Sequence, residues 1–344
     1  QGHSSAMPTC MARDGAQLYY ELHGYPSHPR VLYLPSTGSD LRKVPSIAHS
    51  PLARAFRLLC YDVRGTGRSD KVPAPTWPPP SMAVFVCDAL DLLQAVGWES
   101  CHVFGCSFGG CVGLLLAMQH PGVVRSLCVV CAHAGVPGGG ESPLAPLDRL
   151  SVEARVRRMV ELADTRRDQA WFNSAQGAGL LAFAIRAESE VCSEVGYLEG
   201  RAWGFEARKD YDMTSGLAQL AHVPADVLVL AARFDGLISV EEAWRLFDGV
   251  TWGTASHHRQ PGPVPTCLAL PAGPAPPACA PTGTRLGSRS GDKVTVGPPH
   301  GRREWHLLDT GHWPSVTADK GFWPRVTAFI ASADVRWLAG TAAA

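Results

Sequence analysis

The segment around Ser107 constrains this chain more than any other. A strand-like run, His102 to Phe104, leads into Gly105-Cys106-Ser107-Phe108-Gly109, and an apolar helical segment follows from Val112 to Met118. A Gly-x-Ser-x-Gly turn between a strand and a helix is so tight that the residues flanking the serine must lack bulk. The serine then stands at the tip of the turn, at the positive end of the helix. Plain glycine-rich turns share the pattern, but this context favours an exposed nucleophile.

A nucleophilic serine of this kind needs an acid and then a histidine further along the chain. Asp235 follows the buried run Leu228 to Leu230, and His312 follows the last strand-like run, Glu304 to Leu308. The carboxyl ends of parallel strands share the edge at which open sheets place their ligands. An Asp-Gly pair also occurs in plain turns, and an isolated histidine is often incidental. The order Ser, Asp, His nevertheless favours a catalytic triad.

The chemistry assigns a role to each group. Ser107 is the nucleophile, and His312 removes its proton and returns it to the leaving group. Asp235 fixes the tautomer of the imidazole and stabilises the imidazolium. The oxyanion needs backbone N–H donors, which we expect from Phe108 and from Thr37, in the loop after the first central strand. His306 lies inside a strand and is a poor competitor for His312.

Strands and helices alternate over much of the chain, which predicts an α/β fold with a mostly parallel sheet covered by helices on both faces. Residues 7–134, 223–250 and 304–344 are expected to form this core. Residues 135–222 contain a glycine- and proline-rich linker followed by helical patterns, which predicts an inserted helical lid. Residues 1–6 resemble the remnant of a cleaved purification tag and are excluded from the fold.

Residues 251–303 break this alternation. They are dense in proline and glycine, contain Asp292 as their one acidic residue and show no sustained periodicity. Such a composition cannot bury enough apolar surface to offset the entropy of ordering. We therefore predict a disordered insertion between the second and C-terminal parts of the core.

Composition excludes several classes of function. The formal net charge is zero, which offers no electrostatic case for nucleic acid or a membrane surface as partner. No apolar stretch approaches the roughly 20 residues of a membrane span. The amino terminus lacks the apolar region of a signal peptide. Several of the eleven cysteines lie in apolar segments. These observations favour the cytoplasm, although an organelle lumen stays open, as does the oligomeric state.

Two motifs with other possible chemistries are better explained structurally. Cys128 and Cys131 are spaced like metal ligands, but residues three apart on a strand point to opposite faces, and no second pair completes a zinc site. Gly65-x-Gly67 lies near arginines, yet the third glycine of a dinucleotide loop is missing and no Gly-Lys-Ser/Thr occurs. We expect no metal and no cofactor.

From about residue 12 to 333, leaving out 251–303, the chain resembles the α/β-hydrolase superfamily. Five segments carry the resemblance, in the family's order: Leu34–Gly38, Asp62–Ser69, Gly105–Gly110, Arg233–Gly236 and Gly311-His312. Within the superfamily it resembles the small-ester and lactone branch that includes 3-oxoadipate enol-lactonases. One departure is that Pro35-Ser36 stands where many members have His-Gly. Because the oxyanion donor is a backbone N–H, the change affects the shape of the hole rather than its presence.

The resemblance and the ordered triad together imply a serine hydrolase that cleaves a small carboxylic ester, lactone or thioester through an acyl-enzyme. Hydrolysis of a C–C bond, acyl transfer and peptide cleavage use the same triad and stay open. A non-catalytic protein that binds small molecules on the same fold is the alternative of a different class. The lid contains four aromatic residues that either line an acyl pocket or form the lid's own core: Trp171, Phe172, Phe183 and Trp203.

Overall fold

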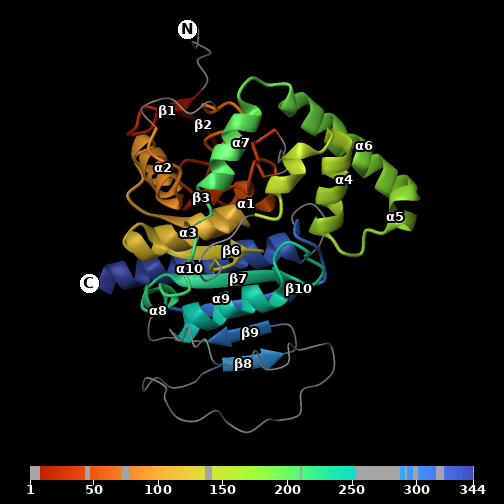
Figure 1. The fold of residues 1–344 in the computed structure, drawn as a ribbon. Coiled ribbons are helices and arrows are strands. Elements are labelled where there is room, and N and C mark those ends of the chain that lie inside the picture. Colours follow the sequence, from red (N-terminus) through yellow and green to blue (C-terminus); the bar gives the residue numbers. More distant parts are fainter. Residues whose placement is uncertain are drawn as a thin grey trace.

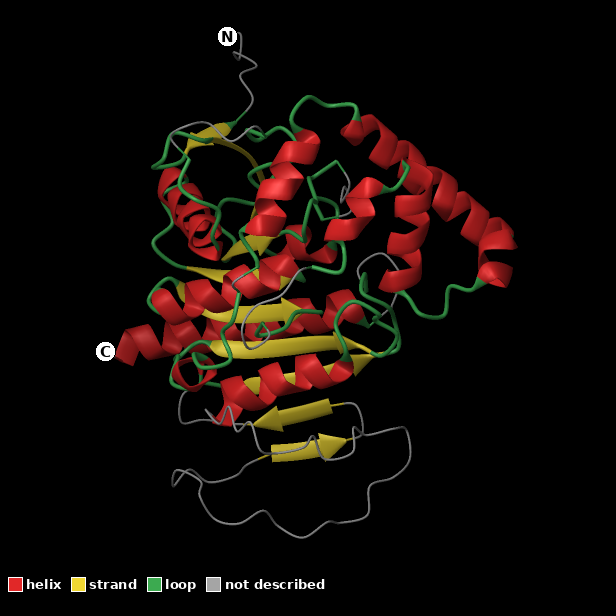
Figure 2. Cartoon of the chain, in the orientation of Figure 1, coloured by secondary structure: helices red, strands yellow, loops and turns green. Residues whose placement is uncertain are grey.

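A single ten-stranded sheet forms the centre of the molecule (Figures 1 and 2). The computed structural model describes residues 8–42, 47–71, 77–135, 142–209, 211–252, 287–290, 293–296, 301–314 and 321–343. The proposed tag remnant, residues 1–6, lies outside them. The strands are β1 (Thr9–Met11), β2 (Gln17–His23), β3 (Arg30–Leu34), β4 (Arg57–Tyr61), β5 (Cys101–Cys106), β6 (Val124–Val130), β7 (Asp226–Ala232), β8 (Gly287–Ser290), β9 (Lys293–Val296) and β10 (Arg303–Leu308).

The strands are arranged in the order β1-β2-β4-β3-β5-β6-β7-β10-β9-β8. From β4 to β10 in this order all neighbours pair in parallel. β2 and β1 add antiparallel strands at one edge, and β9 and β8 do so at the other. The mostly parallel sheet predicted from the alternation of elements is therefore confirmed.

Helices cover both faces of the sheet. Successive residues of a strand point to opposite faces, so Val103 belongs to the buried cluster that includes residues of α2 (Met82–Ala95), α3 (Phe108–Gln119) and α9 (Val240–Trp252). Phe104 belongs to the cluster that includes residues of α1 (Pro51–Ala55) and α10 (Phe322–Ala343). Among the described residues, no helix combines the length and the apolar character needed to cross a bilayer. The core helices are α1 (Pro51–Ala55), α2 (Met82–Ala95), α3 (Phe108–Gln119), α8 (Leu217–Leu220), α9 (Val240–Trp252) and α10 (Phe322–Ala343).

A second group of helices is inserted between β6 and β7. It lies at one end of the molecule, beyond the carboxyl ends of the parallel strands (Figure 1). We call them the inserted helices: η1 (Ala145–Arg149), α4 (Val152–Ala163), α5 (Gln169–Asn173), α6 (Ala175–Cys192) and α7 (Tyr197–Glu206).

The two ends of the inserted segment are fastened to each other. Gly135 and Asp212 form an antiparallel bridge, and the Met213 N–H donates to the Ala134 carbonyl at 2.6 Å. α8 lies inside the predicted lid of residues 135–222 but packs against α3 and α9 of the core. We therefore place the end of the inserted segment near Asp212.

The prediction that residues 251–303 are disordered throughout is wrong for part of them. α9 continues to Trp252, and β9 and β8 extend the sheet from β10. The physical reason is visible in Lys293-Val294-Thr295-Val296, which alternates with the period of a strand and pairs with the otherwise open edge of β10. Residues 253–286, 291–292 and 297–300 lie outside the described residues.

The start of α3 packs directly onto the end of β3, with no room for a side chain between them. A Cβ on Gly109 would lie 2.0 Å from the Leu34 carbonyl oxygen and 2.7 Å from that of Pro35. A Cβ on Gly105 would lie 2.5 Å from the Gly109 oxygen. These approaches explain the glycines of the motif and hold the tip of the turn beside the loop that follows β3.

Replacement of Gly109 by alanine should therefore destabilise the fold by at least about 3 kcal/mol, because backbone atoms rather than a flexible side chain must move. Urea unfolding followed by circular dichroism measures the change. Gly179→Ala, in α6 and with no atom within 4 Å of an added Cβ, is the matched control and should raise stability by about 0.5–1 kcal/mol. Equal stability of Gly109→Ala and the unmodified chain would contradict this packing argument.

Candidate active site

Ser107 occupies a strained turn between β5 and α3. Its φ of 52° and ψ of −118° lie outside the regions that non-glycine residues prefer. The backbone around it is held firmly, since the Ser107 N–H donates to the Val130 carbonyl at 2.7 Å and the Ser107 carbonyl accepts from the Gly110 N–H at 2.9 Å. The side chain is partly exposed. This is the geometry expected for a serine presented at the tip of a sharp turn.

Asp235 and His312 lie together at the same sheet edge. His312 Nδ1 lies 2.7 Å from Asp235 Oδ2, and both side chains are buried. Because a carboxylate accepts, Nδ1 donates, which leaves Nε2 to receive a proton. The other carboxylate oxygen, Oδ1, accepts from the backbone N–H groups of Leu237 at 2.8 Å and Ile238 at 3.0 Å. The orientation of the Asp235 carboxylate is therefore fixed by hydrogen bonds to both of its oxygens.

The end of α4 holds the loops that carry the acid and the histidine. The His312 N–H donates to the Ala163 carbonyl at 2.6 Å, and the Gly236 N–H donates to the Leu162 carbonyl at 2.9 Å. The long segment before β10 therefore does not separate His312 from Asp235.

The predicted oxyanion donors lie on adjoining backbone segments. Ser36 Oγ donates to the Cys106 carbonyl at 3.4 Å, which ties the loop after β3 to the residue before Ser107. Within the part of the chain that the structure describes, neither the Thr37 N–H nor the Phe108 N–H is engaged in a hydrogen bond. Both remain available to an oxyanion.

A narrow cavity of about 20 Å³ lies beside these two residues. We call it the inner cavity; its walls come from the loop after β3, from α2 and α3, from the loop after β4 and from α7. Its lining residues include Thr37, Phe85, Phe108, Arg64, Arg201 and Arg208. The volume matches a group about as large as one water molecule.

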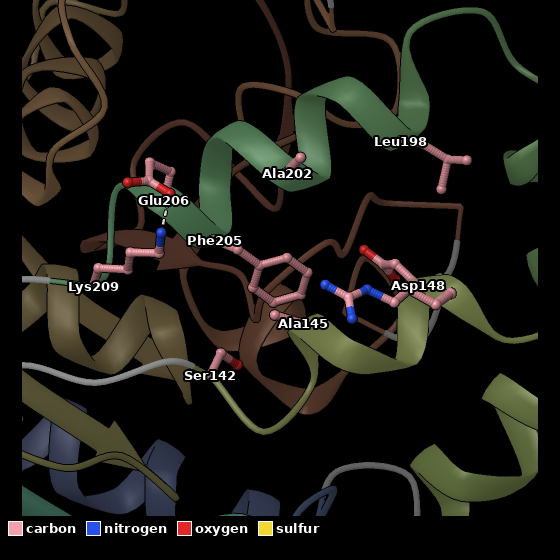
Figure 3. A pocket seen from close by; sticks show the side chains of 9 residues that line it. Ser142, Ala145, Asp148, Leu198, Ala202, Phe205, Glu206 and Lys209 are labelled. Atoms are coloured by element: carbon pink, nitrogen blue, oxygen red, sulfur yellow. Dashed lines mark ion pairs between the residues drawn. The ribbon is translucent and has the colours of Figure 1, made fainter.

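A larger pocket of about 310 Å³ opens between η1 and α7 (Figure 3). Like the inner cavity, it is lined by none of Ser107, Asp235 and His312. Phe205 lines this outer pocket, while its ring lies 4.5 Å from the Arg208 guanidinium carbon. A single aromatic side chain therefore lies between the outer pocket and an arginine of the inner cavity.

The four aromatic residues that the sequence suggested for substrate binding lie in different places, and none lines the inner cavity. Trp203 is buried against Phe85, with ring centroids 5.6 Å apart, and so supports the wall of that cavity. Trp171 and Phe172 pack on each other in α5, while Phe183 is 55% exposed on α6. Their contribution to substrate binding stays a prediction.

The model of the "alpha/beta hydrolase fold" family matches residues 22–250 of this chain. The chain belongs to the α/β-hydrolase family. The predicted fold class and the resemblance to the α/β-hydrolase superfamily are therefore confirmed, while the resemblance to its small-ester and lactone branch stays a prediction.

Similar proteins agree with this assignment. A protein of Variovorax paradoxus (strain S110) named as a carbamate hydrolase, RutD, is 30% identical over 68% of this chain and 84% of its own length. A RutD protein of Caulobacter sp. (strain K31) is 37% identical, but the match spans only 33% of this chain and 41% of that relative. The crystal structure of the enol-lactonase from Burkholderia xenovorans LB400 has a TM-score of 0.64 over 94% of this chain and all of its own, at 18% identity.

Two residues of this α/β-hydrolase were not linked to the candidate site by sequence reasoning. Cys131 has a φ of 47°, and its Sγ lies within 4.8 Å of a carboxylate oxygen of Asp235. Sequence reasoning placed Cys131 on a buried strand, whereas β6 ends at the preceding residue and Cys131 lies in the turn that follows. Arg208 contacts Thr37 through Nη1 and the Phe108 ring at 5.2 Å. No local pattern marks Arg208, because its neighbours come from distant parts of the chain.

Cys131, Asp235 and His312 also offer three atoms of the kinds that bind metal, all within 4.8 Å of one another. A zinc ion would require a thiolate and a deprotonated Nδ1. Burial and the neighbouring Asp235 instead raise the pKa of the Cys131 thiol well above its usual value. Nδ1 hydrogen-bonds directly to the carboxylate. A neutral thiol and a protonated Nδ1 therefore do not suit a zinc site.

The Cys131 thiol should resist alkylation in the folded protein, because burial keeps it neutral and the thiolate is the reactive form. We expect iodoacetamide at pH 7.5 to modify the partly exposed Cys87 well before Cys131, and to modify both in urea. Mass spectrometry of the peptides measures the two rates. Modification of Cys131 as fast as Cys87 in the native protein would show that the thiol is ionised.

Proposed function

We propose that this protein is a serine hydrolase that cleaves a small carboxylic ester, lactone or thioester through an acyl-enzyme. The observation that carries the proposal is the buried hydrogen bond of 2.7 Å between His312 Nδ1 and Asp235 Oδ2. It presents an oriented imidazole at the sheet edge where the strained Ser107 stands. Membership of a hydrolase family supports it.

The residues supply each step of acyl transfer. His312 Nε2 takes the Ser107 proton as Oγ attacks the carbonyl carbon, and the resulting imidazolium is stabilised by Asp235. The N–H groups of Thr37 and Phe108 receive the oxyanion, aided by the positive end of α3. The imidazolium then protonates the leaving group, and a water molecule repeats the sequence to release the acid.

Other reactions that use the same triad determine which substrates should be assayed in one panel. Carbamates belong in it, because relatives are named as carbamate hydrolases and a carbamate carbonyl is open to the same attack. C–C bond hydrolysis, acyl transfer and peptide cleavage remain runners-up.

A non-catalytic binding role is less well supported, because the insertion that motivated it leaves the Asp235–His312 contact intact. The cytoplasmic location remains a prediction.

Replacement of Ser107 by alanine should lower kcat/KM by roughly 10⁴-fold or more, because the remaining machinery cannot form an acyl-enzyme. The assay is a panel of 4-nitrophenyl esters of increasing chain length, supplemented by simple lactones and a carbamate. An organophosphonate should add one phosphonyl group to the unmodified chain, on the peptide that contains Ser107.

The control is the same labelling of Ser107→Ala, which should stay unmodified. Circular dichroism of this variant checks that its fold is intact. Retention of full esterase activity by Ser107→Ala would refute the assignment of the nucleophile.

A further inference from the structure

Three arginines from different parts of the chain line the inner cavity. Arg64 belongs to the loop after β4, Arg201 to α7, and Arg208 to the turn after α7. This arrangement places three positive charges beside the expected oxyanion donors. The groups that balance the charge differ among the three arginines.

Arg64 and Arg201 have carboxylate partners. Arg64 Nε donates to Asp88 at 3.0 Å, and Arg64 also pairs with Asp14 at 2.7 Å. Arg201 donates to Asp148 at 2.8 and 3.2 Å. These carboxylates balance the positive charges of the Arg64 and Arg201 guanidinium groups.

Arg208 has no carboxylate partner anywhere in the described part of the chain. Nη1 donates to the Thr37 hydroxyl, and Nε donates to the Gly204 carbonyl at 3.1 Å. The guanidinium also faces the rings of Phe108 and Phe205 at 5.2 and 4.5 Å. Nη2 is buried and makes no hydrogen bond to any described residue. A buried charged donor without an acceptor is costly.

Arg303 shows how this fold neutralises a buried arginine for purely structural reasons. It also lacks a carboxylate partner among the described residues, but its guanidinium donates to the carbonyls of Val223 at 2.9 Å, Ala225 at 2.7 Å and Val250 at 3.0 Å. Arg208 lacks such a set of carbonyls. Burial, with the nearby Arg201, lowers the pKa of Arg208 to about 10, so the group is still charged at neutral pH.

We propose that Arg208 binds an anionic group of the substrate, a carboxylate, and so selects acyl substrates that carry one. The inference rests on the proposed function and names the substrate class for that site. Thr37 and Phe108, the two expected oxyanion donors, are the residues that Arg208 touches. A carboxylate held by Arg208 therefore lies near the scissile carbonyl, which fits a short acid, and its binding requires side chains around the 20 Å³ cavity to move apart. Guanidinium and carboxylate match in geometry and form charge-assisted hydrogen bonds.

The test compares two esters of similar length, mono-4-nitrophenyl glutarate and 4-nitrophenyl hexanoate, with spontaneous hydrolysis subtracted. The unmodified chain should prefer the anionic ester. In Arg208→Gln, the ratio of kcat/KM for the anionic ester to that for the neutral ester should fall by about 100-fold, mainly through KM. This is the size expected for a lost charge-assisted interaction. In Arg208→Lys, which keeps the charge but not the planar fork, the ratio should fall by about 5–10-fold.

Lys209→Gln is the matched control. It makes the same change of charge at the next residue, which lies at the outer pocket and pairs with Glu206 at 2.6 Å (Figure 3). The substrate ratio should be unchanged in this variant. An equal loss for both esters in Arg208→Gln would overturn the proposal, because it would show that Arg208 supports the oxyanion or the fold instead. If Arg208→Gln fails to fold, the ratio in Arg208→Lys decides.

A binding measurement separates this proposal from the proposed function. Monomethyl glutarate should bind to Ser107→Ala in calorimetry at least about tenfold more tightly than methyl hexanoate, and Arg208→Gln in the same background should remove the preference. Absence of the preference would overturn the anion site even if Ser107 proves to be the nucleophile. Conversely, an active Ser107→Ala would refute the proposed function, while the preference would still establish the anion site.

Discussion

The contact between the start of α3 and the end of β3 is the constraint on which the rest of the site depends. Gly109 brings helix backbone against the carbonyls of Leu34 and Pro35, at a distance that excludes even a methyl group. The same contact exposes Ser107 in a strained conformation and sets the Phe108 N–H beside the loop that carries Thr37. Ser107, the proposed nucleophile, and both expected oxyanion donors are thus positioned by one close approach of backbone to backbone.

The acid and the histidine are held by two independent sets of contacts. Within the sheet, β10 pairs in parallel with β7, and beyond the strands the Arg233 N–H donates to the Leu308 carbonyl at 2.9 Å. From outside the sheet, the end of α4 accepts hydrogen bonds from both loops. Because β10 is fixed by its register against β7, the length and composition of the chain between α9 and β10 have little influence on the distance from Asp235 to His312.

Much of this architecture follows from local patterns. The predicted apolar run Leu228 to Leu230 lies within β7, because a strand buried on both faces is an uninterrupted apolar run. The closeness of Asp235 and His312 could be predicted because each follows one of two strands whose carboxyl ends share an edge of the sheet. Arg208 could not be, since its environment arises only when α7 meets Thr37, 171 positions away in sequence. β8 and β9 were missed because only four residues of each form a strand inside a segment dominated by proline and glycine. β9 is stabilised by pairing with β10, and β8 by pairing with β9, rather than by local preference.

The inserted helices contact both the proposed triad and the proposed anion site. α4 supports the acid and the histidine, while α7 and the turn after it bring Arg201 and Arg208 to the inner cavity. α7 is itself seated tightly, because a Cβ on Gly200 would lie 2.2 Å from the Gly65 carbonyl oxygen of the core. Displacing α7 to admit a substrate would break this contact and disturb the helices that support the triad. Rotation of Phe205 would leave this contact intact, and its ring both lines the outer pocket and lies 4.5 Å from the Arg208 guanidinium carbon. The packing therefore favours access through a moving side chain over the opening of a whole lid.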